Sequence, residues 1–329
     1  MPDLYDVAAI GNAIVDVIAP CDDAFLATNG LDKGAMMLVD QAQSAALYAK
    51  MAAGVETSGG SAANTVAGLA SFGGGGAFMG KVADDWLGEV FRHDMKAIGA
   101  RFENAPLVGG PGTAISMINV TPDAQRTMCT YLGASVEFAD HDVEDDVVQG
   151  AKIVYLEGYL FDAEAARRAF AKAAGLAHGA GRMIALTLSD AFMVERHRAA
   201  LLGFTETQVD LLFANEAEVC SLFQTDDFDV AVEQLRPKVK LAAVTRGAAG
   251  SVILSQGERL SVAAHPVEKV VDTTGAGDQY AAGFMFGLAR GRPLQQCGTL
   301  ASLAAAEVIS HYGPRPQVSL KDLAAAEGY

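Results

Sequence analysis

The segment from Asp272 to Asp278 has the composition of a phosphate-binding turn between a strand-like and a helix-like run. The small residues Gly275, Ala276 and Gly277 let the backbone approach a ligand closely, and the start of the following helix presents N–H groups to an anion. A carboxylate at this place suits a general base that takes the proton from an attacking hydroxyl. We therefore expect Asp278 to be a base; an ordinary helix cap is the alternative.

Two upstream segments place polar side chains where they could meet a substrate. Gly59 and Gly60 open a helix-like segment whose Asn64 amide can both donate and accept. Asn12 and Asp16 follow the first strand-like run, where a carboxylate beside an amide is well placed to bind a diol. Each pattern also fits an ordinary structural role, a capped helix or a strand-end turn. The second pattern favours a substrate with hydroxyl groups.

The composition excludes several classes of protein. The 329 residues are 51% hydrophobic and carry a formal charge of −16, which disfavours nonspecific binding to nucleic acid or anionic membrane. The four cysteines are scattered, as in a reducing compartment. The first residues lack the basic stretch of a signal peptide, and no apolar run reaches membrane-spanning length. We expect a cytoplasmic protein, monomeric or homodimeric.

Short apolar runs alternate with longer amphipathic ones, which is typical of βαβ units and a mostly parallel sheet. Strands are expected at 6–11, 77–82, 153–158, 183–188, 210–215, 241–246 and 251–255. Helices are expected at 61–72, 85–98, 163–177, 216–223, 228–236, 279–290 and 294–311. Residues 12–47 and 104–131 contain turn signals typical of hairpins. We predict a large α/β domain (1–11, 48–103 and 132–329) and a small β lid (12–47 and 104–131).

The turn at 272–278, together with residues 279–284, resembles the C-terminal signature of the ribokinase-like (PfkB) carbohydrate and nucleoside kinases. Residues 59–67 resemble the N-terminal signature of the same family. Three weaker matches, at 80–88, 215–218 and 245–250, occur in the family's order. The resemblance spans about residues 11–290 and implies a ribokinase-like three-layer α/β/α domain with a small β-sheet lid. It also implies phosphate transfer from ATP with Mg²⁺.

The resemblance implies roles for individual residues. Asp278 would be the base beside a phosphate-binding turn, and Gly59, Gly60 and Asn64 would lie against substrate hydroxyls. Glu218 would order Mg²⁺ through water. The nucleotide would be bound by Asn215, Thr245, Arg246, Gly247, Gly250, Gly275 and Gly277. Asp272 and Thr274 resemble positions where some relatives bind a monovalent cation, so K⁺ is a further candidate cofactor.

The acceptor is best matched by adenosine kinases, whose G-N-x-x-x-D stretch the segment from Asn12 to Asp16 resembles. Arg126 resembles an arginine that reaches the transferred phosphate in these enzymes; a surface arginine is the alternative. Met37, Met128 and Tyr159 could line a purine site, or could belong to the core. We expect phosphorylation of the 5′-hydroxyl of adenosine, a step of purine salvage.

Alternatives remain. The acceptor could be another purine nucleoside, or a sugar as in ribokinases and fructokinases. Fructose 6-phosphate is disfavoured because the expected lid has few basic residues besides Lys33 and Arg126. A non-catalytic nucleoside-binding module is disfavoured because Asp278, Glu218 and the glycine turn are all present. A dehydrogenase or a P-loop enzyme is disfavoured because neither G-x-G-x-x-G after the first strand nor G-x-x-x-x-G-K-[ST] occurs.

Overall fold

A computed structural model of the chain describes residues 4–123, 125–255 and 257–329. Its larger sheet has eight strands, which pair in parallel except that β12 pairs antiparallel with β11 and with the edge strand β13. The strand order is β13 (Glu258–Val262), β12 (Ser251–Ser255), β11 (Leu241–Thr245), β10 (Leu211–Asn215), β9 (Met183–Thr187), β8 (Ala151–Glu157), β1 (Tyr5–Ile10), β5 (Gly76–Met79). The predicted mostly parallel sheet is confirmed.

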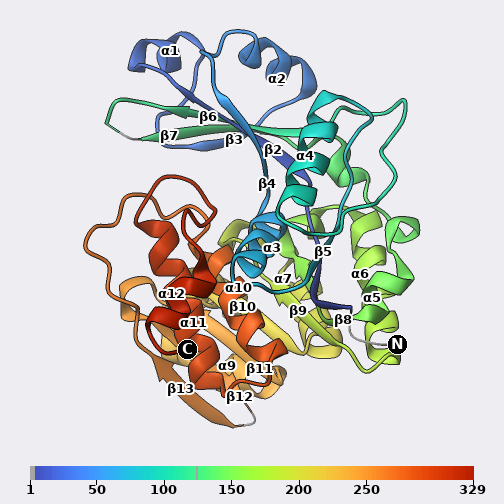
Figure 1. Cartoon of the computed structure of the whole chain (residues 1–329), viewed down its shortest axis with the longest axis vertical. Coiled ribbons are helices and arrows are strands. Elements are labelled where there is room, and N and C mark those ends of the chain that lie inside the picture. The colour runs from blue at the N-terminus through green and yellow to red at the C-terminus, as the bar shows by residue number, and fades with distance from the viewer. Residues whose placement is uncertain (1–3, 124, 256) are drawn as a thin grey trace.

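Helices cover both faces of this sheet, which gives three layers (Figure 1). One face carries α3 (Ser61–Ser71), α4 (Trp86–Ala97), α10 (Ala276–Ala289) and α11 (Leu294–Ile309). The other carries α5 (Asp145–Gly150), α6 (Glu164–Gly179), α7 (Ala191–Gln208), α8 (Glu216–Phe223) and α9 (Phe228–Leu235). Side chains alternate between the two faces along strand β1. Val7 and Ala9 pack in the core that contains α3 and α10, whereas Ala8 and Ile10 pack in the core that contains α6 and α7. Helix α12 (Leu320–Ala326) packs against α11 and α3.

A second sheet of five strands lies above the first, at the top of Figure 1. Its order is β3 (Met36–Leu38), β7 (Arg126–Tyr131), β6 (Ala114–Val120), β2 (Ile14–Pro20), β4 (Val55–Gly59). Strands β6 and β7 form the antiparallel hairpin predicted within 104–131. Strand β4 pairs with β2, although its residues fall in the range 48–103 that we assigned to the large domain.

The hairpin predicted within 12–47 is wrong. This segment instead contains β2, α1 (Asp23–Thr28), β3 and α2 (Gln41–Tyr48). Each helix begins at an aspartate cap: Asp22 accepts from the Phe25 N–H, and Asp40 forms a capping box with Gln43. These caps satisfy backbone donors that a hairpin would have paired across strands. Strand β2 therefore finds its partners in β4 and β6, from more distant parts of the chain.

The seven strands and seven helices predicted for the large domain all occur, each within about three residues of its expected bounds. Five described helices and strands outside the lid segments were not predicted: β4, β13, α5, α7 and α12. The carboxyl ends of β1, β8, β9, β10 and β11 meet at one edge of the large sheet, because these strands are parallel. Within the described residues, no helix is both long and apolar enough to span a bilayer.

Candidate active site

A cavity of about 750 Å³ lies between this carboxyl edge and the small sheet. Its lining combines residues that follow the parallel strands with residues of β2, β3, β6 and β7. Most of the predicted site residues line it: Asn12, Asp16, Gly60, Asn64, Met128, Tyr159, Asn215, Glu218, Thr245, Thr274, Gly275, Ala276, Gly277 and Asp278. Residues far apart in the sequence are thus brought to one place.

Asp278 is the third residue of α10, and two donors from α3 hold its carboxylate. Ser61 Oγ donates to Oδ1 over 2.6 Å, and Asn64 Nδ2 donates to Oδ2 over 3.3 Å. The helix cap is Gly275, with no side-chain cap, so the cap alternative for Asp278 does not hold. Burial raises the pKa of Asp278 to about 6, against the lowering effect of both donors and of the Arg315 charge. At neutral pH this carboxylate can accept a proton.

The turn before α10 places its two glycines in different environments. Gly275 has φ near +79°, and a Cβ there would lie 2.6 Å from the backbone of Pro314. A Cβ on Gly277 would meet no described atom within 4 Å, and Gly277 lines the cavity. The first N–H groups of a helix lack intrahelical acceptors and favour a negative ligand. The turn therefore offers open space and N–H donors next to Asp278, as a phosphate group requires.

Gly59 and Gly60 leave space for the polar groups of Asp16 and Asn12 at the cavity. A Cβ on Gly59 would collide with the Asp16 carboxylate, and one on Gly60 would collide with the carbonyl oxygen of Asn12. Gly60 also has φ near +90°, which disfavours other residues. The pair is thus required by the close approach of β2 and the loop before it. The first N–H groups of a helix commonly lack a protein partner, but here the Ala62 N–H donates to a protein carboxylate.

That carboxylate belongs to Glu157, at the end of β8, which is 1% exposed. Glu157 Oε2 accepts from the Ala62 N–H, and Oε1 accepts from Asn12 Nδ2, both over 2.8 Å. Burial raises the pKa of Glu157 to about 7, against the lowering effect of these donors. The contact fixes the Asn12 amide and leaves its Oδ1 buried without a partner among the described residues.

Asp16 lies on β2, and the described residues donate no hydrogen bond to its carboxylate. Burial raises its pKa to about 7, although the charges of Arg315 and Arg126 act in the opposite direction. Asp16 and Asn12 therefore present acceptor oxygens to the same cavity. Buried acceptors without partners are costly unless a ligand satisfies them, and hydroxyl groups are suitable donors.

The small sheet gives the cavity an apolar wall made of Ile14, Met36, Leu38, Ile118, Met128 and Leu132. Met36 and Leu38 are 52% and 60% exposed, which is unusual for large apolar side chains. Because side chains alternate along a strand, Met37 lies on the opposite face of β3 and packs against the core. The structure thus places its two neighbours, and not Met37, in the cavity.

Two aromatic side chains extend the apolar lining. Tyr159 is 39% exposed, and its hydroxyl donates to the Ser189 carbonyl over 3.4 Å. Phe192, at the start of α7, is 72% exposed. Both belong to the same cavity as Met36 and Leu38. An apolar ligand group would cover this exposed surface.

Three residues expected to bind the nucleotide do not line the cavity. Arg246 pairs with Glu216 over 3.2 Å, and its guanidinium lies 3.9 Å from the centre of the Phe228 ring. Gly247 and Gly250 shape the turn between β11 and β12, where a Cβ on Gly250 would collide with the Val262 carbonyl. Their local contacts explain why these residue types occur there.

Arg126 reaches the turn before α10 from the small sheet, but it does not line the cavity. Its Nη1 lies 2.7 Å from Asp272 Oδ2 and donates to Thr274 Oγ1 over 3.1 Å. Asp272 also accepts from the Thr274 N–H and hydroxyl and from the Gly313 N–H. With four donors on its two oxygens, this carboxylate has no free position for a cation. A K⁺ ion at Asp272 and Thr274 would have to displace at least one of these donors, and the K⁺ site stays a prediction.

Glu218 belongs to the cavity lining and is 4% exposed. It forms a reciprocal capping box with Asn215, whose N–H and Nδ2 donate to it over 3.0 and 2.6 Å. Burial raises the pKa of Glu218 to about 7, and the charge of Asp190 raises it further. Within the described residues, no three His, Cys, Asp or Glu side chains form a direct metal cluster. A metal here would rely on ligands from the nucleotide and water.

Several lining residues were not predicted from the sequence, including Ser61, Glu157, Phe192 and Pro314. Glu157 could have been found, because it is a carboxylate at the carboxyl end of a buried strand, the same kind of position as that of Asn12 after β1. Ser61 adjoins the recognised glycine pair. Pro314 lies in a segment without periodicity, and no signal in the sequence points to it.

The sequence profile described as "pfkB family carbohydrate kinase" matches residues 6–320 of this chain. The chain is 27% identical to the adenosine kinase of Saccharomyces cerevisiae over 94% of this chain and 96% of that protein. It is 30% identical to the probable chloroplastic fructokinase-6 of Arabidopsis thaliana over 72% of this chain, a match that spans 64% of that relative's length.

Among solved structures, the chain is similar to the adenosine kinase from Sinorhizobium meliloti. The two share 53% sequence identity and a TM-score of 0.91, over 99% of this chain and 100% of the other. Such similarity supports the same arrangement of the two sheets. Relatives with nucleoside and with sugar acceptors both occur, so the family alone leaves the acceptor open.

Proposed function

The chain belongs to the pfkB family of carbohydrate kinases, and we propose that it transfers the terminal phosphate of ATP to the 5′-hydroxyl of adenosine. The observation that carries the proposal is the division of the cavity lining. Polar acceptors, Asn12 and Asp16, stand near the catalytic turn, whereas Met36 and Leu38 form an exposed apolar surface. A nucleoside has the same division into a polar ribose and a flat apolar base.

In this proposal, the ribose hydroxyls donate to the unpartnered oxygens of Asn12 and Asp16. Glu157 keeps the Asn12 amide in place, because it holds Nδ2 and leaves Oδ1 free. The base lies against the apolar wall, with Tyr159 and Phe192 as further contacts. Each buried apolar group adds about 25 cal/mol per Å² that it removes from water.

Asp278 then acts as the general base. It accepts the 5′-hydroxyl proton as the oxygen attacks the terminal phosphate, and the bond to the ADP leaving group breaks in line. The N–H groups of the turn from Gly275 to Gly277 face the charge on the transferred phosphate. Ser61 and Asn64 keep the carboxylate aimed at the cavity throughout.

Kinases of this family use ATP and Mg²⁺ in general, and the residues present fit that requirement. The carboxylate of Glu218 lies in the cavity lining and is suited to order the water around a nucleotide-bound Mg²⁺. Thr245 and Asn215 lie beside it, at the ends of β11 and β10. Arg126, which now pairs with Asp272, would have to leave that pair to reach the phosphate.

The small sheet would act as the predicted lid, because it carries the acceptor-binding wall and faces the catalytic turn across the cavity. Closure over the bound nucleoside would exclude water, which otherwise competes as an acceptor for the phosphate.

A second candidate is a sugar kinase, favoured by the similarity to a probable fructokinase. A free sugar carries hydroxyls on most sides and would leave the apolar wall uncovered. Because of the apolar wall, we prefer nucleoside phosphorylation to sugar phosphorylation as the function.

Steady-state ADP release from MgATP tests the proposal, with adenosine, inosine, guanosine, ribose and fructose 6-phosphate as acceptors. We expect the highest kcat/KM with adenosine. A clear preference for a sugar or sugar phosphate would reject the acceptor while leaving the family assignment intact.

A further inference from the structure

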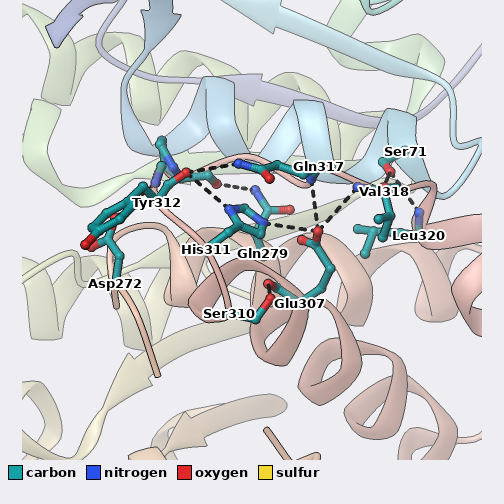
Figure 2. Close-up of polar contacts among 12 residues, drawn as sticks. Ser71, Asp272, Gln279, Glu307, Ser310, His311, Tyr312, Gln317, Val318 and Leu320 are labelled. Carbon is teal, nitrogen blue, oxygen red and sulfur yellow. Dashed lines mark hydrogen bonds and ion pairs between the residues drawn. The ribbon is translucent and has the colours of Figure 1, made fainter. Parts of the chain in front are cut away.

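The C-terminal segment 310–318 lies against the catalytic turn and is firmly anchored. Glu307, at the end of α11, is 7% exposed, and its Oε1 accepts from the N–H groups of Gln317 and Val318 and from His311 Nε2 (Figure 2). Ser71 adds a contact from α3: its hydroxyl donates to the Val318 carbonyl. The position of this segment is therefore fixed by contacts to two helices.

The same segment touches both elements that carry the catalytic residues. Pro314 packs on Gly275, and the Gly313 N–H donates to Asp272. Gln279 Nε2, from the first turn of α10, donates to the carbonyl oxygens of both Pro314 and Asn64. The segment, α10 and α3 thus meet at Gln279, the residue that follows Asp278.

Arg315 projects from this segment toward the catalytic carboxylate. Its Nε donates to Asn64 Oδ1 over 3.1 Å, and Asn64 Nδ2 in turn donates to Asp278 over 3.3 Å. Arg315 Nη2 is buried and has no partner among the described residues. A guanidinium can only donate, so Arg315 must contact the oxygen of the Asn64 amide. The amide nitrogen is then the end that faces Asp278. Reversal of the amide would place Oδ1 against the carboxylate.

We propose that Arg315 is a positioning residue for the reaction: it holds the Asn64 amide in the orientation that donates to Asp278 and supplies positive charge beside Asp16 and Asp278. This inference rests on the proposed function, because it assigns a role relative to the base. Arg315 acts through Asn64 and through its charge, and it was not among the residues that the sequence patterns indicated.

The charges around Asp278 explain why a cation is needed there. Two carboxyl groups, Asp16 on β2 and Glu157 on β8, interact electrostatically with Asp278. The phenols of Tyr155 and Tyr159, on β8 and in the loop after it, do so as well. On the cationic side, Arg315 acts on both Asp16 and Asp278, and Arg126 acts on Asp16. Asp94 on α4 also interacts with Arg315. Removal of Arg315 therefore leaves Asp278 among carboxylates with less compensation.

The test is the pH dependence of kcat for the full-length wild type, Arg315→Met and Arg315→Lys, with MgATP and saturating adenosine. Arg315→Met should lower kcat by roughly 10- to 100-fold, the range for a lost hydrogen bond that involves a charged group. The midpoint of the acidic limb should move to higher pH, because loss of a cation raises the pKa of Asp278. Arg315→Lys keeps the charge and should retain the wild-type midpoint.

Arg259→Gln is the matched control, because Arg259 pairs with Asp229 outside the cavity and its loss changes the net charge equally. A purely structural role for Arg315 would lower kcat by one factor at every pH; an unmoved midpoint in folded Arg315→Met overturns the proposal. If Arg315→Met does not fold, Arg315→Lys is the deciding variant. A lysine variant that folds but is as inactive as Asp278→Asn would also overturn the proposal. If the wild type itself phosphorylates no acceptor, the proposed function fails instead.

Discussion

The two walls of the cavity differ in how their side chains are held. At the turn before α10, Asp278 accepts from two side chains of α3, and Asp272 accepts from four donors, two of them backbone N–H groups. On the small sheet, Asp16 has no hydrogen bond from the described residues, and Met36 and Leu38 are more than half exposed. Protein groups hold the carboxylates of the first wall, whereas the proposed acceptor would satisfy the polar and apolar groups of the second.

This difference separates two kinds of energetic contribution. Groups fixed before the reaction can stabilise the transition state without reorganisation, so changes there should lower kcat. Groups that the acceptor satisfies contribute to its binding, so changes there should raise its KM. Each substitution below tests whether its wall behaves as assigned.

The largest effect is expected for Asp278→Asn. The amide keeps the size of the side chain but cannot accept the proton, so turnover should fall about 10²- to 10⁴-fold, the range for a lost general base. Because proton removal comes late in a loose phosphoryl transfer, the lower end of this range is compatible with the mechanism. Single-turnover rates and calorimetric binding of adenosine and MgATP are the measurements. A folded variant with near-normal kcat would show that Asp278 is not the base.

A comparison of Gly275→Ala with Gly277→Ala sharpens the picture of the turn. Gly275 has positive φ and abuts the backbone of Pro314, so alanine should destabilise the fold by roughly 1–3 kcal/mol and reduce turnover. Gly277 faces open space, so alanine there should leave the melting temperature unchanged but weaken MgATP binding. Thermal unfolding with and without MgATP separates the two. Equal melting temperatures would contradict the assigned contact with Pro314.

On the acceptor wall, Asp16→Ala should raise the KM for adenosine and lower kcat/KM. Loss of a charged hydrogen-bond partner costs roughly 1.5–3 kcal/mol, or about 10- to 150-fold. Binding of MgATP should change little, because Asp16 belongs to the small sheet and faces the acceptor end. Parallel titrations of both substrates provide the measurement. If both affinities fell together, Asp16 would have a structural role instead.

The smallest effect is expected for Leu38→Ser. Its side chain is 60% exposed, so the fold should not depend on it, whereas a bound base would cover it. Removal of this apolar contact should raise the KM for adenosine by about tenfold or less, at roughly 0.8 kcal/mol per buried methylene. Val108→Ser is the matched control, because Val108 is 75% exposed and lies outside the cavity lining. Similar KM values for both variants would mean that the base does not contact this wall.

The sequence alone allowed prediction of the features that depend on local patterns. The period of apolar residues located the core strands and helices to within a few residues. The glycine turn and Asp278 were recognisable because their chemistry lies within one short segment. The same holds for Asn215 and Glu218, which cap one helix three residues apart.

Features that depend on distant parts of the chain could not be predicted in this way. Met37 was preferred over Met36 and Leu38 because the sequence does not indicate which face of a three-residue strand meets the cavity. The role of Glu157 depends on contacts with Asn12 and Ala62, more than ninety residues away. Arg315 reaches Asn64 across 251 positions, from a segment without periodicity.

We propose that the apolar wall selects a nucleoside, which is phosphorylated at the turn that precedes α10. The most direct test is a competition in one reaction: limiting MgATP with equal concentrations of adenosine and ribose, followed by identification of the phosphorylated products by mass spectrometry. We expect adenosine 5′-monophosphate with little ribose phosphate. Accumulation of ribose phosphate while adenosine remains unchanged would contradict it.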